Sequence, residues 1–325
     1  MASRRLQGFW GILGILILIL DSRTAVQGAR DGIILCMHTV IPSLFPFLVL
    51  SRLITGSLLG RGLPLLRGPA RLLGLPTGGE SMLIGIYLGG YPIGAGIAAE
   101  EYHKGKLSRE EALRLLRFCN QPGPAFLFGM VGCFFVSRTD VWMLWLIQII
   151  SSLLVSFCCP SRNFATIQTD TRPTSASSAL RESVGTMGII CGWIVLFRIM
   201  LTYLDRWFLH LLPAPWRVGI AGLLELSNGC CSLGMIADNS IRFLLCTIML
   251  SLGGLCVAMQ TQSVIGALPI GSYLQGKLLQ TIFAVFLSLA YIRKMPIYLL
   301  SLLPALYLRF RFPRKTSSNP SGFGV

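Results

Sequence analysis

The chain consists of long apolar runs separated by short polar segments. Several runs reach about 20 residues, the length that an α-helix needs to cross the hydrocarbon core of a bilayer. We expect membrane segments, in chain order, at residues 6–20, 32–54, 81–99, 125–136, 141–159, 184–204, 218–236, 241–265, 273–292 and 296–308. The pattern predicts an all-α, polytopic helical membrane protein with about eight to ten membrane segments.

The first run, residues 6–20, is short for a membrane span and follows Arg4 and Arg5. These are also features of a signal peptide, and residues 25–29 form a weak cleavage-site pattern. Because many apolar runs follow, we favour the alternative in which residues 1–24 form an uncleaved N-terminal membrane segment.

Glycine and proline interrupt several of the runs. Pro42 and Pro46 each remove a backbone donor, so we expect the second run to lose helical pairing there. Residues 56–80 are rich in glycine and proline and predict an interfacial or re-entrant segment. Residues 89–96 hold four glycines and a proline and predict a break in the third run. In lipid, irregular backbone survives only where protein buries it or where it lines a cavity.

A polar segment with its own helix signal follows the third run. Ser108 and Glu111 have the spacing of a capping box, and the residues after them are amphipathic through Cys119. Asn120 and Gln121 come next, and Pro122 ends the helix. The sequence therefore predicts a short helix that stops abruptly at two side-chain amides.

A polar linker, residues 160–182, divides the chain near its middle. It separates a first membrane repeat, residues 25–159, from a second, residues 183–308. The tail at 309–325 is basic and rich in glycine, serine and proline, and we expect it to be disordered.

Two short features recur in the same order on the two sides of the linker. Arg30–Asp31 and Arg181–Glu182 each open a run, and Leu88–Gly90 and Leu252–Gly254 each lie inside a later one. The recurrence predicts two related halves with interrupted helices. Interrupted segments in corresponding halves are typical of a transporter site near the middle of the membrane. The alternative is that paired glycines only let helices pack closely.

Composition narrows the class of protein. Of the 325 residues, 53% are hydrophobic and 13% are charged, and the mean hydropathy is +0.68. These values exclude an ordinary soluble enzyme, a disordered chain and a coiled coil. The net charge is +15, but basic residues lie at the ends of apolar runs, as at Arg293–Lys294. This placement is typical of anchoring to lipid head groups, so we expect the bilayer, and no nucleic acid, as a partner.

The reactive side chains form no recognisable catalytic or metal-binding pattern. The ten cysteines lie almost all in apolar runs, where cysteine acts as a small hydrophobe, and no CxxC pair is present. The GxSxG and HExxH motifs are absent as well. We therefore expect no enzyme activity, no metal site and no cofactor.

Glu225 is the clearest candidate for a functional side chain, because an ionisable residue inside an apolar run is costly. As a hypothesis, it binds a cation or a proton, or accepts hydrogen bonds from a solute. Ser227 and Asn228 add polar groups, and Gly229 permits an unwound backbone. The alternative is a polar packing network.

The interrupted segments supply the rest of a candidate site. Freed N–H groups at a break suit a negatively charged ligand, and side-chain amides suit a polar planar one. Close packing by small residues and capping of freed backbone groups are the alternatives. The expected substrate-binding residues are Gly89, Gly90, Tyr91, Pro92, Gly94, Gly96, Asn120, Gln121, Glu225, Ser227, Asn228, Gly253, Gly254 and Gln260.

Several of these motifs resemble the YlbJ-type sporulation integral membrane proteins, of the broader nucleoside-recognition, or gate, membrane domain group. The resemblance is carried by residues 42–47, residues 90–95, residues 105–118, Asn120, and residues 252–255 with Gln260. The chain departs from the family pattern where Gly96 replaces a lysine, where Gln121 follows Asn120, and where Ala258 replaces a histidine. The resemblance implies a role in spore formation and passage of a small molecule across the forespore membrane, with dipicolinate-like or nucleoside-like cargo.

These observations lead to one expected function and one rival. We expect a multi-pass protein of the cell membrane, with the forespore membrane implied by the resemblance, that moves a small polar or anionic solute. A coupling ion and a homo-oligomer are open alternatives. The rival is a non-transporting membrane scaffold needed for assembly of the spore cortex or coat.

Overall fold

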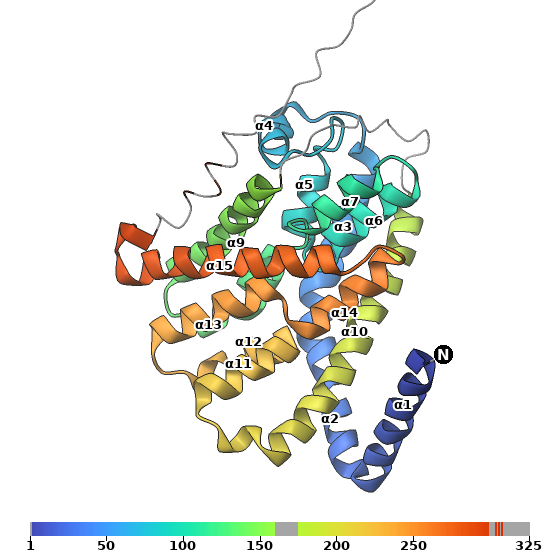
Figure 1. Ribbon diagram of the computed structural model, residues 1–325, viewed down its shortest axis with the longest axis vertical. Helices are drawn as coiled ribbons and strands as arrows, with labels where there is room; N and C mark the ends of the chain where they lie inside the picture. The colour runs from blue at the N-terminus through green and yellow to red at the C-terminus, as the bar shows by residue number, and fades with distance from the viewer. Residues whose placement is uncertain (1, 160–174, 299–302, 304, 306, 308–325) are drawn as a thin grey trace, which may run out of the picture.

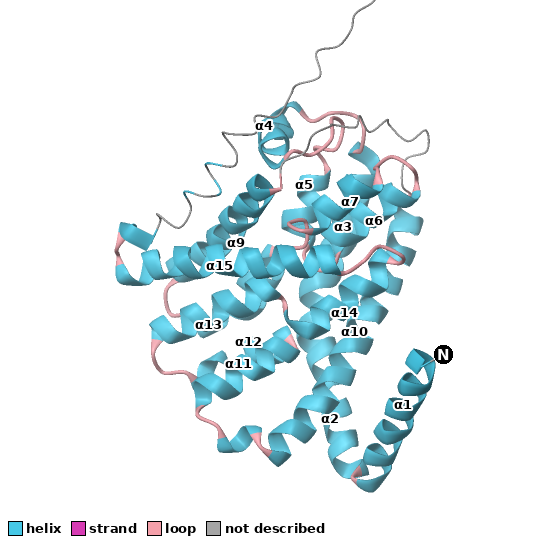
Figure 2. Ribbon diagram, in the orientation of Figure 1, coloured by secondary structure: helices cyan, strands magenta, loops and turns pink. Residues whose placement is uncertain are grey.

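The computed structural model describes residues 2–159 and 175–298, together with residues 303, 305 and 307. Every regular element in these residues is a helix (Figure 2). The expected tail at 309–325 and most of the expected linker lie outside the described residues. Residues 176–182, at the end of that linker, are helical, because Ser175 accepts a hydrogen bond from the Ser178 amide and starts a long helix.

The elements of the first half begin with two apolar helices and continue through shorter pieces. They are α1 (Ala2–Leu20), α2 (Ser22–Leu35), the π turn η1 (Cys36–Val40), α3 (Ile41–Leu58), α4 (Pro64–Leu73), α5 (Met82–Ile84), η2 (Gly85–Gly89), α6 (Ile93–His103), α7 (Arg109–Leu116), α8 (Pro124–Phe126), η3 (Leu127–Val131), η4 (Gly132–Phe134) and α9 (Arg138–Cys158).

The second half begins with the longest helix of the described chain. Its elements are α10 (Ala176–Trp207), η5 (Leu209–Leu211), α11 (Ala214–Leu224), α12 (Leu226–Cys231), η6 (Ser232–Met235), α13 (Asn239–Leu252), α14 (Gly254–Ile265) and α15 (Gly271–Arg293). Figure 1 shows their arrangement.

Five helical segments in the described residues are long and apolar enough to cross a membrane. They are Ser22–Leu58, Arg138–Cys158, Ala176–Trp207, Asn239–Ile265 and Gly271–Arg293. The prediction of an all-α, polytopic membrane protein is confirmed. Among the other apolar runs, shorter helices form at Gly11–Leu20 and Pro124–Phe134, because these runs are short or interrupted. Most of the expected segment 296–308 lies outside the described residues.

Large apolar side chains are exposed on α1 and on part of α2. Ile12, Ile19, Leu20, Val26 and Ile33 are all more than half exposed. Water would oppose such exposure, whereas lipid tails accept it. In Figure 1, α1 stands apart from the rest of the bundle.

The prediction that Pro42 and Pro46 break the second run is wrong. α2, η1 and α3 continue without a gap from Ser22 to Leu58. A π turn precedes Pro42, and the Ser43 hydroxyl donates to the Thr39 carbonyl oxygen over 2.7 Å. A wider π turn before Pro42 relieves the clash between the proline ring and the preceding turn, so the helix continues.

Two short helices follow this long helix. Within residues 56–80 the chain forms α4, which Gly74 caps, and the interfacial or re-entrant placement of this segment stays a prediction. The capping box at Ser108 and Glu111 is present, with the Glu111 amide donating to the Ser108 hydroxyl and the Glu111 carboxylate accepting from the Ser108 amide.

Each half contains a long helix, two interrupted helices and a second long helix. In the first half, η2 and α6 meet at one interruption, and α7 and α8 meet at another. In the second half, α11 and α12 form the first interrupted pair, and α13 and α14 form the second. Leu88–Gly90 therefore lies at the first interruption of its half, and Leu252–Gly254 at the second. The duplication stays a prediction, but both glycine pairs lie at helix breaks.

The helix α10 runs antiparallel to α2 and α3 and joins the two halves (Figure 1). A Cβ atom at Gly28 would lie 2.8 Å from the Ile199 Cα atom, and one at Gly32 would lie 3.0 Å from the Val195 Cα atom. Arg52, near the other end of the same segment, pairs with Glu182. Small residues let the two helix backbones approach closely, as is usual in membrane helix pairs.

Candidate functional site

The two interruptions of each half touch each other. In the first half, Gly90 has a φ of +83°, and a Cβ atom there would lie 3.2 Å from the Gly123 nitrogen. In the second half, a Cβ atom at Gly254 would lie 2.7 Å from the Gly222 carbonyl oxygen, just before Glu225. A larger residue at either glycine would push the two broken helices apart. Each half therefore presents one compact region of irregular backbone.

These two regions share a central cavity of about 30 Å³. The first half contributes Tyr91 and Gly123, and the second half contributes Glu225, Ser227 and Gln260. The rest of the lining is apolar and comes from Val40, Leu44, Phe126, Ile190, Ile194, Leu226 and Val257. A space of this size holds about one water molecule.

Glu225 caps the helix that follows it. Its carboxylate accepts hydrogen bonds from the Ser227 amide over 3.0 Å, from the Asn228 amide over 2.7 Å and from the Asn228 side-chain amide over 2.6 Å. The residue is 1% exposed. The predicted neighbours Ser227 and Asn228 are thus in contact with Glu225, and the contacts are those of an N-cap.

A series of polar and charged side-chain contacts connects this cap to α10 and α2. Arg198 donates to the Asn228 side-chain oxygen over 2.8 Å and forms an ion pair of 3.1 Å with Asp31 of α2. The carboxylate of Glu225 is therefore linked through Asn228 to the helix pair α2 and α10.

The predicted amides connect the two halves. Asn120 donates to the Thr261 hydroxyl of α14 over 2.9 Å. Gln121 and Gln280 of α15 exchange hydrogen bonds of 3.1 and 2.6 Å. Gln260 lines the central cavity and donates to the Cys256 sulfur one turn earlier. Of these three predicted amides, Gln260 lines the cavity, whereas Asn120 and Gln121 join the first half to α14 and α15 away from it.

Some of the predicted glycines are tightly packed against neighbouring chain, whereas Gly96 lies beside open space. A Cβ atom at Gly94 would lie 1.8 Å from the Cys119 carbonyl oxygen, and one at Gly89 would lie 2.8 Å from Ile93. Gly253 has a φ of +77° and caps α13. A Cβ atom at Gly96 meets nothing within 4 Å, and this residue lines a larger cavity together with Pro92.

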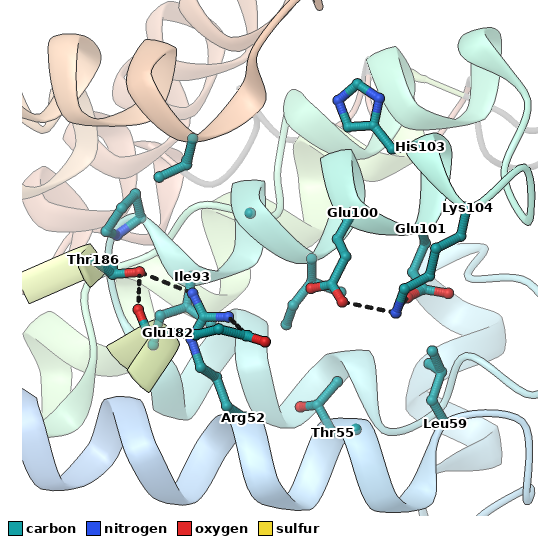
Figure 3. Close-up of a pocket in the computed structure, with 15 residues that line it drawn as sticks. Arg52, Thr55, Leu59, Ile93, Glu100, Glu101, His103, Lys104, Glu182 and Thr186 are labelled. Carbon is teal, nitrogen blue, oxygen red and sulfur yellow. Dashed lines mark hydrogen bonds and ion pairs between the residues drawn. The ribbon is translucent and has the colours of Figure 1, made fainter. Parts of the chain in front are cut away.

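That larger cavity, of about 520 Å³, lies at the end of the molecule where α10 begins. Figure 3 shows Arg52 of α3 directed at Glu182 and Thr186 of α10, with the ion pair at 2.7 Å. On the opposite wall, Lys104 forms an ion pair of 2.7 Å with Glu100. Burial opposes the charge of Lys104, but Glu100 and Glu101 outweigh this effect and raise the pKa of the amine.

A third cavity, of about 340 Å³, lies toward the other end of α10. Its lining includes Asp31, Arg198, Asp205, Arg217 and Asn228. The three cavities follow one another along α10, because Glu182 and Thr186 line the first, Ile190 and Ile194 the central one, and Arg198 to Asp205 the third.

Sequence reasoning missed one buried charge. Lys277 of α15 is 2% exposed, and its amine donates to the Gln280 side-chain oxygen over 3.0 Å. The nitrogen lies 5.3 Å from the centre of the Tyr91 ring. The argument that singled out Glu225, an ionisable residue inside an apolar run, applies equally to Lys277 in the run 273–292.

No metal-binding group is present in the described part of the chain. A set of three histidine, cysteine, aspartate or glutamate side chains that could hold an ion does not occur there. The cysteines of this part are free thiols.

Comparison with known proteins gives one informative similarity. No protein-family model matches the chain, and no solved structure matches it. The chain is 30% identical over 132 residues to a protein named "Sporulation integral membrane protein YlbJ" from Bacillus subtilis (strain 168). The match covers 39% of this chain and 32% of the relative, so it spans about a third of that protein's length. It supports the resemblance to YlbJ-type proteins, while the nucleoside-recognition group stays a prediction. The chain is thus a multi-pass helical membrane protein with a partial similarity to a sporulation membrane protein.

Proposed function

We propose that this protein is a membrane carrier that moves a small polar or anionic solute through a site between its two halves. The observation that carries the proposal is the meeting of four helix interruptions around one central cavity. Irregular backbone at membrane depth is costly, and it persists where it serves a cavity. Paired interruptions near the middle of the membrane are the usual construction of a carrier site.

The arrangement of cavities along α10 supports a path. A wide cavity lies near each end of α10, and a central one that holds about one water molecule lies between them. A solute larger than water fits the centre only after the walls separate. We therefore interpret this conformation as a closed one, in which the ion pairs Arg52–Glu182 and Asp31–Arg198 hold the ends together.

The biological setting comes from the relative. Its name describes a sporulation integral membrane protein. We propose that this chain also acts in spore formation, in the forespore membrane, and that its cargo resembles dipicolinate or a nucleoside.

The test is uptake of labelled dipicolinate and of labelled uridine by proteoliposomes that hold the purified protein. Gln260→Leu removes a polar group from the central cavity, and Gln262→Leu is its matched control, half-buried on the same helix but outside that cavity. We expect saturable uptake of one solute, a decrease of about ten-fold for Gln260→Leu and no change for Gln262→Leu. Folded protein that takes up neither solute would contradict the proposal and favour the scaffold function.

A further inference from the structure

Lys277 is an ionisable group enclosed by protein about two turns from the start of the membrane-spanning helix α15. The next residue toward the N-terminus, Gly276, packs on the chain at Arg117, where a Cβ atom would lie 2.0 Å from the carbonyl oxygen. This close approach seats α15 against the end of α7 and leaves Lys277 with 2% of its surface exposed. A lysine so deep in a membrane protein is a functional candidate by default.

The surroundings of the Lys277 nitrogen are polar but uncharged. Its hydrogen-bond partner is Gln280, and the Tyr91 ring faces it from the first interruption. The Cys119 thiol faces it from the end of α7, and α9 and α13 contribute Gln148 and Ser251 to the adjoining network. Within the described residues, no carboxylate lies within 4.0 Å of the amine.

Lys104 provides a comparison within the same protein, because carboxylates surround its amine and keep it charged. Its amine lies 2.7 Å from a Glu100 oxygen and 3.2 Å from a Glu101 oxygen. Two carboxylates keep that amine protonated. Lys277 has no such partner, so nothing of opposite charge holds it in the ammonium form.

An anion cannot easily take the place of the missing carboxylate. None of the three cavities described above is lined by Lys277. Tyr91 lines the central cavity, and its ring faces the amine. In this conformation Lys277 therefore touches the cavity only through Tyr91, and we infer that its charge changes by exchange of a proton and not by contact with the solute.

A hydrogen-bond network connects Lys277 to the helix interruptions, so a change of charge on the amine would alter the contacts there. Gln280, which accepts from the amine, also donates to Gln121 over 2.6 Å and to Gln148 over 3.2 Å. Gln148 in turn donates to Ser251, two residues before Gly253, over 3.1 Å. Together with Tyr91, this network touches both interruptions of the first half and one interruption of the second.

We propose that Lys277 binds and releases the coupling proton of the transport cycle. The proposal rests on the carrier function proposed above. When the walls separate toward the side where the solute enters, the amine lone pair takes one proton from a hydronium ion, forms an N–H bond and leaves a water molecule. The same bond breaks on the other side and returns the proton to water. Glu225 is less suited to this task, because three hydrogen bonds hold its carboxylate as a helix cap.

The experiment measures proton entry and solute uptake in the same vesicles, with a pH-sensitive dye trapped inside and labelled dipicolinate or uridine outside. In wild-type vesicles we expect the inward solute gradient to acidify the interior. Lys277→Met removes the exchangeable proton and should abolish this acidification. Lys294→Met, exposed at the end of the same helix, is the matched control and should leave it unchanged.

Lys277→Arg keeps the experiment decisive if the methionine variant does not fold. Arginine stays charged at all accessible pH values, so this variant should also lose solute-driven acidification. Solute uptake without proton entry in the wild type, or acidification that survives in a folded Lys277 variant, would overturn the assignment of Lys277. Absence of uptake in the wild type would instead contradict the carrier function itself.

Discussion

Asp31 of α2 and Arg198 of α10 form an ion pair of 3.1 Å, and Arg52 of α3 and Glu182 of α10 repeat the arrangement at the other end of the same helices. The acid of one pair, Asp31, belongs to α2, whereas the acid of the other pair, Glu182, belongs to α10. Such an exchange of roles is what a two-fold relation between two segments produces. Glu182 and Asp31 are also the acids of the Arg-acid dipeptides that recur in the sequence, and the duplication of the two halves stays a prediction.

We expect Asp31→Asn to speed solute uptake about two- to five-fold, because the ion pair favours the closed conformation by about 0.5–1 kcal/mol. The two side chains are 30% and 34% exposed, so the free energy of unfolding should change by less than about 1 kcal/mol. Uptake kinetics and thermal unfolding of the same preparation check both values.

The charge-exchanged variant with Asp31→Arg and Arg198→Asp serves as the control for this prediction. It restores an ion pair between the helices and should return uptake toward the wild-type rate. A large loss of thermal stability with unchanged uptake in Asp31→Asn would instead assign the pair a purely structural role.

Two glycines of α6 should respond in opposite ways to alanine. A Cβ atom at Gly94 would lie 1.8 Å from the Cys119 backbone oxygen, whereas one at Gly96 meets nothing within 4 Å. We expect Gly94→Ala to lower the free energy of unfolding by about 1–3 kcal/mol and Gly96→Ala to leave it nearly unchanged. Thermal unfolding in detergent measures the difference, and equal stability of the two variants would contradict the packing described here.

Glu225 should behave as a helix cap. Glu225→Ala removes the acceptors for two backbone amides and should destabilise the protein by about 1–2 kcal/mol. Glu225→Gln keeps one acceptor and should cost less. If Lys277 carries the proton, uptake by Glu225→Gln retains the pH dependence of the wild type. Loss of that dependence in Glu225→Gln would move the coupling site from Lys277 to Glu225.

The charge of Lys104 should matter little to the pH dependence of uptake. Its pKa is raised above the usual value for lysine, so its ion pairs are fully present below that usual value and are lost only as the pH rises through the raised one. Between pH 6 and 8 we therefore expect Lys104→Met and wild type to show the same pH profile of uptake. A profile that differs would place a second titrating group near the large cavity.

The positions of the helix breaks can be predicted from the sequence, whereas the contacts between distant parts of the chain around them cannot. Gly90 and Gly253 mark interruptions because glycine backbone adopts conformations that end a helix, and this is a local property. Glu225 and its neighbours are predicted together because they are adjacent in the chain. The link from Gln121 to Gln280 joins residues 159 positions apart, and such a contact depends on packing that no local pattern contains.

Two failures have separate physical causes. Pro42 and Pro46 suggest a break, but the helix continues through both prolines, and a wider π turn before Pro42 accommodates the first ring. Lys277 lies within an apolar run, and its burial depends on the close contact between Gly276 and Arg117, which unites distant parts of the chain.

The central claim is that the cavity between the two halves opens to one side of the membrane at a time. Counterflow tests this claim most directly. Proteoliposomes are loaded with unlabelled dipicolinate or uridine, and uptake of the same labelled solute is followed from a dilute external solution. A carrier predicts a transient accumulation of label above equilibrium in loaded vesicles, which is reduced by Gln260→Leu and retained by Gln262→Leu. Equal uptake in loaded and empty vesicles, from protein shown to be folded, would contradict the carrier account.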